Sequence, residues 1–193
     1  MHHIYHTEGI ILGNKNYGEA GKYYSVFTRD LGMIYASAQG VRKMSSKLRF
    51  ILQDFSCIKM DFVRGKDFWR ITSASKTNRI ENIKKKREKL IIIANISNLL
   101  KRLLVGEEPN SDLFDDLLNG LSFLEKSQSN DDLSNIEVII VLRILDNLGY
   151  LGNNNSLNAL AKSPFEENLV FEASQKRAKI LSEINKALGE SQL

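Results

Sequence analysis

The fold of the first part of this chain is decided by one basic stretch, Gly40-Val-Arg-Lys-Met-Ser-Ser-Lys-Leu-Arg-Phe50. This stretch, the basic loop, holds no acid and four cations: Arg42, Lys43, Lys47 and Arg49. Burying unpaired charges costs too much free energy, so the loop must lie in solvent or against an anionic partner. Residues 31–39 and 52–63, on either side of it, have the pattern of β-strands. A basic loop between two strands of a small β-domain is typical of a nucleic-acid-binding groove.

Residues 1 to about 78 alternate between apolar and polar side chains with a period of two. Ile58, Met60 and Phe62 point to one face and Lys59 and Asp61 to the other, as in a half-buried strand. Similar runs predict four further strands, at residues 5–12, 23–28, 33–39 and 67–72. Five short strands separated by glycines and charged turns favour a small closed or half-open barrel of the OB type.

Beyond Thr77 the apolar period changes to that of a helix. Amphipathic stripes cover residues 92–104, 113–124 and 133–148, and a weaker stripe covers residues 178–188. Asn110 is a good residue to begin the second helix, and Gly149 is a good residue to end the third. The sequence therefore predicts an α+β fold, with an OB-type barrel over residues 1–78 and an all-helical domain over residues 79–193.

The charge of the chain is unevenly distributed. Residues 1–78 carry 12 Lys and Arg against 6 Asp and Glu, whereas residues 79–193 carry 15 against 17. Positive charge confined to one domain indicates an electric field directed at a polyanion. The single cysteine, Cys57, excludes an intrachain disulfide and a four-cysteine zinc module. No apolar run approaches the roughly 20 residues of a membrane helix, and the N-terminus lacks a signal-peptide core, so we expect a cytoplasmic protein without membrane contact.

Several short motifs occur in the order and spacing of a known family. They are Glu8-Gly9-Ile10-Ile11-Leu12, Tyr17-Gly18-Glu19, Phe27-Thr28-Arg29, Gly40-Val41-Arg42-Lys43, Ser46-Lys47-Leu48-Arg49 and Leu52-Gln53-Asp54-Phe55, followed by Glu108-Pro109-Asn110 and Leu148-Gly149-Tyr150. On these residues the chain resembles the DNA repair protein RecO family over about residues 4–151.

The resemblance implies an N-terminal OB domain followed by a helical domain, in a recombination mediator that is not an enzyme and has no cofactor. Members of the family bind single- and double-stranded DNA and anneal complementary strands. They act with the partner RecR and with single-strand-binding protein, through its acidic C-terminal tail, and they assist the loading of RecA. A bacterial cytoplasmic location at the nucleoid is implied as well.

One region departs from the family pattern. Many members carry a four-cysteine zinc module directly after the pair that corresponds to Gly149-Tyr150. Here residues 151–156 read Leu-Gly-Asn-Asn-Asn-Ser, with neither cysteine nor histidine. Because a structural zinc site needs about four such ligands, we expect this chain to lack the zinc module.

The candidate DNA-binding residues fall into two groups. The four cations of the basic loop would neutralise phosphates without reading sequence, and two further cations join them, Arg29 at a strand end and Lys15 in the first loop. The second group, Lys84, Lys85, Lys86 and Arg87, would occupy all sides of the first turns of a helix. There the charges oppose the helix dipole, which weakly favours a compensating anion. For both groups the alternative is a solvated charged surface.

The aromatic residues divide into core and surface candidates. OB-type proteins stack bases on exposed rings, but most rings of a small barrel must fill its core. We assign Phe27, Phe55 and Phe62 to the core and expect Tyr17 and Tyr35 to be the residues that stack on bases.

Two other functions compete with DNA binding. In the first, the protein is an interaction adaptor whose helical domain docks partners and whose contact with DNA is incidental. In the second, it is a hydrolase, which needs converging carboxylates or a histidine-assisted nucleophile. Asp112, Asp115 and Asp116 have the spacing expected for the start of a soluble helix, so we expect no catalytic activity.

Overall fold

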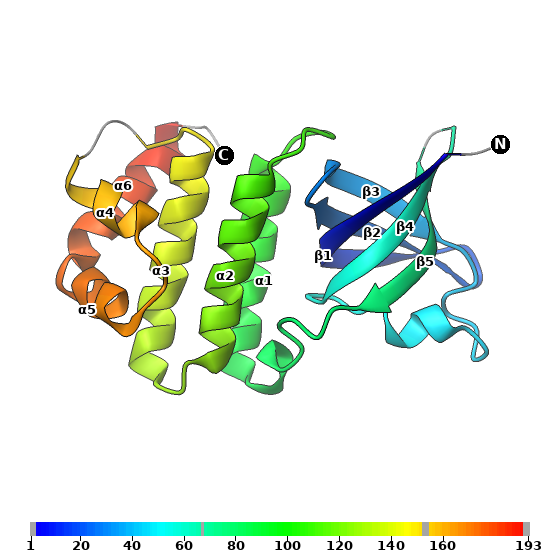
Figure 1. Cartoon of the computed structure of the whole chain (residues 1–193), viewed down its shortest axis with the longest axis horizontal. Helices are drawn as coiled ribbons and strands as arrows, with labels where there is room; N and C mark the ends of the chain where they lie inside the picture. Colours follow the sequence, from blue (N-terminus) through cyan, green and yellow to red (C-terminus); the bar gives the residue numbers. More distant parts are fainter. Residues whose placement is uncertain (1–2, 67, 152–154, 191–193) are drawn as a thin grey trace.

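Five strands close into a barrel in the computed structural model, which describes residues 3–66, 68–151 and 155–190. The strands are β1 (Ile4–Tyr17), β2 (Gly21–Thr28), β3 (Gly32–Ala38), β4 (Cys57–Arg64) and β5 (Trp69–Lys76). Their order around the barrel is β1-β2-β3-β5-β4, and β4 pairs back onto β1 (Figure 1). The predicted OB-like barrel is confirmed.

The long strand β1 belongs to both halves of the barrel. Its first part pairs with β4 and its second part pairs with β2, and the register shifts between Ile11 and Gly13. The sequence placed a loop at residues 13–21, but the chain bulges at this shift and continues to pair as far as Tyr17. The prediction that Lys15 lies in a loop was therefore wrong, because Lys15 is part of β1 and pairs with Tyr23.

The barrel is packed on two faces. Its interior is filled by side chains from all five strands, including Ile11, Tyr24, Val26, Ile34, Ile58, Met60, Phe62 and Trp69. Part of its outer surface is also buried, because Phe27, Met33 and Cys57 face the helices. Phe27 and Phe62 are core residues as predicted, although they belong to different cores, and Phe55 is only partly buried.

The helical part contains the elements that the amphipathic stripes predicted, together with two short helices that they did not. The helices are α1 (Arg87–Leu103), α2 (Ser111–Lys126), α3 (Asn130–Asn147), α4 (Asn155–Lys162), α5 (Glu167–Gln175) and α6 (Arg177–Glu190). Asn110 caps α2 as expected, since its side-chain oxygen accepts a hydrogen bond of 2.9 Å from the backbone N–H of Leu113. The helices α4 and α5 are short and offer few apolar positions for a period to be recognised.

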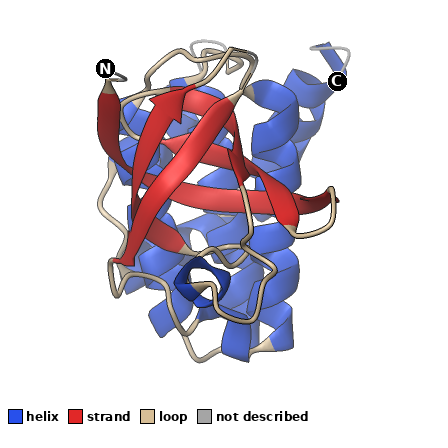
Figure 2. Cartoon of the chain, turned by 90° about the vertical axis from the view of Figure 1, so that its right-hand side faces the viewer, coloured by secondary structure: helices blue, strands red, loops and turns tan. Residues whose placement is uncertain are grey.

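Helices α1 and α2 lie directly against the barrel, and α3 to α6 lie behind them (Figures 1 and 2). One apolar core runs from the barrel surface through α1–α3 to α5 and α6. The rings of Phe27 and Phe114 meet edge to face within it, with centroids 5.6 Å apart. The boundary proposed after residue 78 lies in the segment between β5 and the short 3₁₀ helix η2 (Ile83–Lys85).

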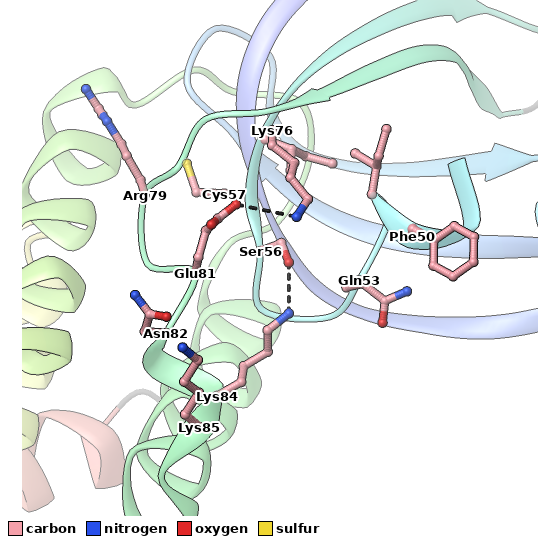
Figure 3. Close-up of a pocket in the computed structure, with 12 residues that line it drawn as sticks. Phe50, Gln53, Ser56, Cys57, Lys76, Arg79, Glu81, Asn82, Lys84 and Lys85 are labelled. Atoms are coloured by element: carbon pink, nitrogen blue, oxygen red, sulfur yellow. Dashed lines mark hydrogen bonds and ion pairs between the residues drawn. The ribbon is translucent and has the colours of Figure 1, made fainter. Parts of the chain in front are cut away.

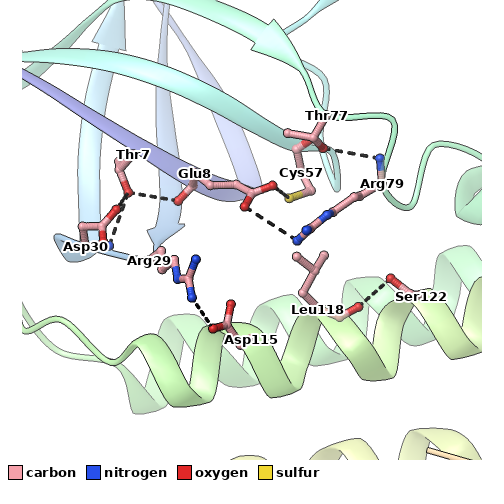
Figure 4. A network of polar contacts seen from close by, with 10 residues as sticks. All are labelled: Thr7, Glu8, Arg29, Asp30, Cys57, Thr77, Arg79, Asp115, Leu118 and Ser122. Carbon is pink, nitrogen blue, oxygen red and sulfur yellow. Dashed lines mark hydrogen bonds and ion pairs between the residues drawn. The ribbon is translucent and has the colours of Figure 1, made fainter.

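Polar contacts add to this packing around the edge of the interface (Figure 4). Arg79 lies 3.7 Å from the Glu8 carboxylate, and the Cys57 thiol donates to Glu8 at 3.5 Å. Burial and the neighbouring Glu8 raise the pKa of Cys57 to about 12, so this thiol remains protonated at neutral pH. On another side, Trp69 Nε1 donates to the Glu107 carboxylate at 2.9 Å.

None of the helices that the structure describes has the length and apolar character needed to cross a membrane. Within the same residues, no three His, Cys, Asp or Glu side chains are grouped as metal ligands would be. Part of the region that replaces the family's zinc module, residues 152–154, lies outside the described residues.

The continuous core predicts that barrel and helices unfold together. Phe114→Ala should lower the free energy of unfolding by about 3–5 kcal/mol, because it removes a fully buried ring from the barrel–helix interface. Urea unfolding should be followed by the fluorescence of Trp69, the single tryptophan, and by helical circular dichroism. Both signals should shift to the same lower midpoint. Phe171→Ala, at an exposed ring, is the control and should change stability by about 0.5 kcal/mol or less. A shift of the helical signal alone would contradict a shared core.

Candidate nucleic-acid interface

The basic loop connects β3 to β4 and closes one end of the barrel. Val41 and Leu52 are buried in the barrel core, and Leu48 and Ile51 pack against it. The loop includes the 3₁₀ helix η1 (Lys47–Phe50) and is tied to the β1–β2 turn, since the Arg42 N–H donates to Ala20 O at 2.9 Å. Apolar side chains thus anchor the loop while its cations stay outside.

The four cations of the basic loop are exposed. Among the described residues, no carboxylate lies within ion-pair distance of any of them. Arg42 reaches the β1–β2 turn, with Nη1 3.5 Å from Gly18 O. Arg49 places its guanidinium 5.8 Å from the centroid of the Phe50 ring. These charges are available to an anionic partner.

The second basic group is not arranged as predicted. Lys84 and Lys85 lie in η2, and Lys86 has an extended backbone that precedes α1, so only Arg87 is within that helix. Lys84 Nζ donates to Asp54 O at 3.2 Å and to Ser56 Oγ at 3.0 Å. The expectation of four cations around one helix start was wrong, because the chain makes a 3₁₀ turn before α1 begins.

The members of this second group also point to different neighbours. Lys86 Nζ donates to Gln128 Oε1 at 2.9 Å, near the turn between α2 and α3, whereas Lys84 is bound to the segment just after the basic loop. Burial lowers the pKa of Lys84. Lys85 and Arg87 are exposed. Lys84 and Lys85 line one pocket with Phe50 of the basic loop, whereas Lys86 points away to the turn between α2 and α3.

Arg29 is placed at the other end of β2 from the basic loop. Its Nη2 atom lies 2.5 Å from the Asp115 carboxylate on α2 (Figure 4). The basic loop is hydrogen-bonded to Ala20, directly before β2 begins, whereas Arg29 directly follows the last residue of β2. Arg29 thus connects the barrel to α2, and the structure does not bring it together with the other predicted cations.

Strand pairing sets four polar or aromatic residues in a row across the outer surface of the barrel. The register joins Lys15 to Tyr23, Tyr23 to Ser37, and Ser37 to Arg70. Residues paired directly across strands project from the same face, and Tyr24, the neighbour of Tyr23, points into the core. A cation therefore stands at each end of this row, with an aromatic ring between them.

Four aromatic rings gather on this surface, which we call the aromatic face: Tyr17, Tyr23, Tyr35 and Phe68. The centroids of Tyr17 and Tyr23 are 4.4 Å apart, and those of Tyr23 and Phe68 are 5.2 Å apart. Tyr17, Tyr35 and Phe68 are each about half exposed, at 52%, 54% and 50%. Exposed rings beside cations form a platform on which bases of a single strand can stack.

The aromatic face contains both residues predicted to stack, Tyr17 and Tyr35, and two that were not predicted. Tyr23 could have been found from the alternation around Tyr24, but Phe68 could not, because it lies in the turn before β5 rather than in the strand expected there. Lys101 of α1 was missed as well. Its Nζ atom would lie 3.7 Å from a Cβ at Gly13, and Gly13 is joined to Tyr35 through Ser25 in the strand register, so a cation from the helical part borders the face.

The aromatic face and the basic loop form one surface. Tyr17 ends β1, and Arg42 contacts the carbonyl of Gly18 directly after it. The face covers β2, β3 and the turns between β1 and β2 and between β4 and β5, which is where OB folds bind oligonucleotides. Away from this surface, Asp115 forms an ion pair with Arg29, and Asp116 forms one with Arg143.

Two family models match this chain. The one described as "Recombination protein O N terminal" matches residues 1–79, and the one described as "Recombination protein O C terminal" matches residues 85–174.

Curated proteins named DNA repair protein RecO are similar to this chain. The protein of Thermodesulfovibrio yellowstonii is 32% identical over 76% of this chain and 58% of its own length. The protein of Rubrobacter xylanophilus is 30% identical over 65% of this chain and 50% of its own length. The protein of Caldanaerobacter subterraneus is 26% identical over 87% of this chain and 66% of its own length. This chain thus spans about half to two thirds of the length of these relatives.

The aromatic face predicts a contribution to binding that does not depend on salt. Tyr35→Ala and Phe68→Ala should each weaken the binding of a single-stranded oligonucleotide, since a stacked base contributes about 1–3 kcal/mol. The slope of log K against log salt should stay unchanged, because neither variant removes a charge. Fluorescence anisotropy at several salt concentrations measures both quantities. Phe171→Ala, an exposed ring on α5, is the matched control. Unaltered affinity in both face variants would exclude stacking at these positions.

Proposed function

This chain belongs to the RecO family, and we propose from this premise that it acts in DNA repair and recombination by binding single- and double-stranded DNA through its barrel. The observation that carries the proposal is the single surface made by the aromatic face and the basic loop. It combines exposed rings with cations that have no carboxylate partners among the described residues. This is the combination that retains single strands without reading their sequence.

The same surface supports strand annealing as the proposed activity. Two complementary strands repel each other through their phosphates, and cations that contact both of them lower this repulsion. Each phosphate contact also releases condensed counterions, which makes binding steeply dependent on salt. Rings that hold bases by their faces leave the hydrogen-bonding edges open to a complementary strand. No catalytic residue or cofactor is needed for this activity.

We further propose, from membership of the family, that the protein works with RecR and with single-strand-binding protein to assist RecA loading. In this proposal the barrel supplies the contact with DNA and the helical part is available for protein partners. The adaptor function is the rival proposal. It would be favoured by DNA binding that is weak and independent of strand length, beside tight binding to RecR or to the acidic tail of single-strand-binding protein.

Neutralising the basic loop tests the electrostatic part of this proposal. The variant with Arg42, Lys43, Lys47 and Arg49 all changed to Ala should bind single-stranded DNA with a flatter salt dependence. The slope should fall by about 0.7 for each phosphate contact that is lost. The annealing of two labelled complementary strands, followed by energy transfer, should slow as well.

The matched control neutralises four exposed cations on the helices: Arg102, Lys126, Lys162 and Lys179. It removes the same charge and should leave the slope close to that of the unaltered protein. An equal slope in the loop variant and the unaltered protein would place the phosphate contacts elsewhere. An unaltered protein that neither binds nor anneals strands at low salt would refute the proposed function.

A further inference from the structure

Residues 49–53 form a ridge at the end of the barrel, with a pocket on each side. The barrel-end pocket, of about 330 Å³, lies between the ridge and β1–β2 and is lined by Lys22, Arg42 and Arg49. The junction pocket, of about 290 Å³, lies between the ridge, the end of β5 and η2. Gln53 lines both pockets, so the ridge is the wall between them.

Both pockets are basic, and their cations come from different elements. The barrel-end pocket has three cations and no acid among its lining residues. The junction pocket has four cations, Lys76, Arg79, Lys84 and Lys85, against the single acid Glu81 (Figure 3). The Lys76 ammonium lies 3.6 Å from the Glu81 carboxylate, and the position of the Lys84 ammonium is fixed by its hydrogen bond to Ser56 Oγ. Each pocket therefore has a net positive charge of its own.

The ridge is a fixed part of the barrel. Leu52 is anchored in the barrel core, and its N–H donates to Leu48 O at 2.9 Å. Gln53 Nε2 donates to Arg49 O at 2.5 Å, and the Phe55 N–H donates to Ile11 O at 2.8 Å. With both of its ends held in this way, the ridge separates the two sets of cations.

The ring of Phe50 projects from this ridge. It is 69% exposed and lines the junction pocket, while its neighbour Arg49 lines the barrel-end pocket. A single exposed ring is common on protein surfaces, but Phe50 stands between two groups of cations, which the exposed Phe171 ring does not. Apolar side chains that stand between phosphate contacts are used by nucleic-acid-binding proteins to wedge against base steps.

We propose that the two pockets hold the phosphates of two nucleic-acid strands, one on each side of the ridge, and that Phe50 stacks on a base where the strands meet. The inference rests on the proposed annealing function and adds a geometry to it. One strand follows the aromatic face past Arg42 into the barrel-end pocket, and the other enters the junction pocket. The cations line two hollows rather than a flat plane, which favours separate strands over a lipid surface.

The number of strands bound per chain tests this geometry. The unaltered protein should bind two short, non-complementary single-stranded oligonucleotides per chain at low salt in a fluorescence titration. Lys76→Ala combined with Lys85→Ala should bind one, with an affinity within about twofold of the tighter site of the unaltered protein. Its annealing rate should fall at least tenfold, because the second strand is no longer held. Arg42→Ala combined with Arg49→Ala should instead weaken the binding of the strand that occupies the barrel-end pocket.

Phe50 is tested separately, because its change removes no charge. Phe50→Ala should still bind two oligonucleotides with an unaltered salt slope, and its annealing rate should fall about fivefold or more. Phe171→Ala is the matched control and should anneal normally. Trp69 emission shows whether each variant retains a folded barrel, and Lys76→Gln combined with Lys85→Gln provides a second junction variant that should also bind one strand.

Three outcomes would overturn the inference. One oligonucleotide per chain in the unaltered protein would mean a single continuous site, and it would leave the proposed function intact. Vesicles of phosphatidylglycerol that bind equally tightly and displace both oligonucleotides would assign the ridge to membranes. If the unaltered protein bound no oligonucleotide at all, both the proposed function and this inference would be refuted.

Discussion

The burial of Val41 and Leu52 at the end of the barrel determines where every cation of the basic loop stands. A loop with four cations and no acid would be expected to extend into water, where it could adopt many conformations. Two apolar anchors instead hold it across the barrel end, and the 3₁₀ helix η1 fixes the residues between them. The cations then have defined positions beside the β1–β2 turn, so that a charged loop becomes part of a rigid surface.

The bulge in β1 has a comparable effect on the aromatic face. Ile10 before the bulge and Leu12 at the bulge point outward to the helices, and after it Lys15 and Tyr17 point outward to solvent. Continued alternation without the bulge would have directed Lys15 and Tyr17 into the barrel. One extra residue in a strand thus allows β1 to supply the helix interface with one half and the candidate DNA surface with the other.

The architecture was predictable wherever one physical pattern repeats over many residues. The period of two identified the barrel strands, and the helical period identified α1–α3 and α6, because burial of one face requires such repetition. The position of Lys15 was not predictable, since the bulge depends on pairing with a strand distant in sequence. The same holds for Phe68, whose exposure depends on a turn, and for Arg29, whose partner Asp115 belongs to α2. The cations of the basic loop were found from composition alone, but the position of Arg42 and Arg49 at the barrel-end pocket depends on how the loop folds over the barrel, and that fold has no sequence period.

The packing of the helices also decides which surface of the barrel can bind a ligand. Phe27 and Met33 lie on the same outer face of β2 and β3 as Tyr23 and Tyr35, at alternating positions along each strand. Helices α1 and α2 cover the first pair and leave Tyr35 exposed and Tyr23 partly exposed. The interior of the barrel is filled, and the helices cover that part of its outer surface. The surface that remains accessible to a ligand therefore consists of the aromatic face and the barrel end that the basic loop closes. The position of the candidate interface is therefore a consequence of how the two parts of the chain pack. The helical part also contributes positive charge to this interface, because Lys101 of α1 lies at the edge of the aromatic face.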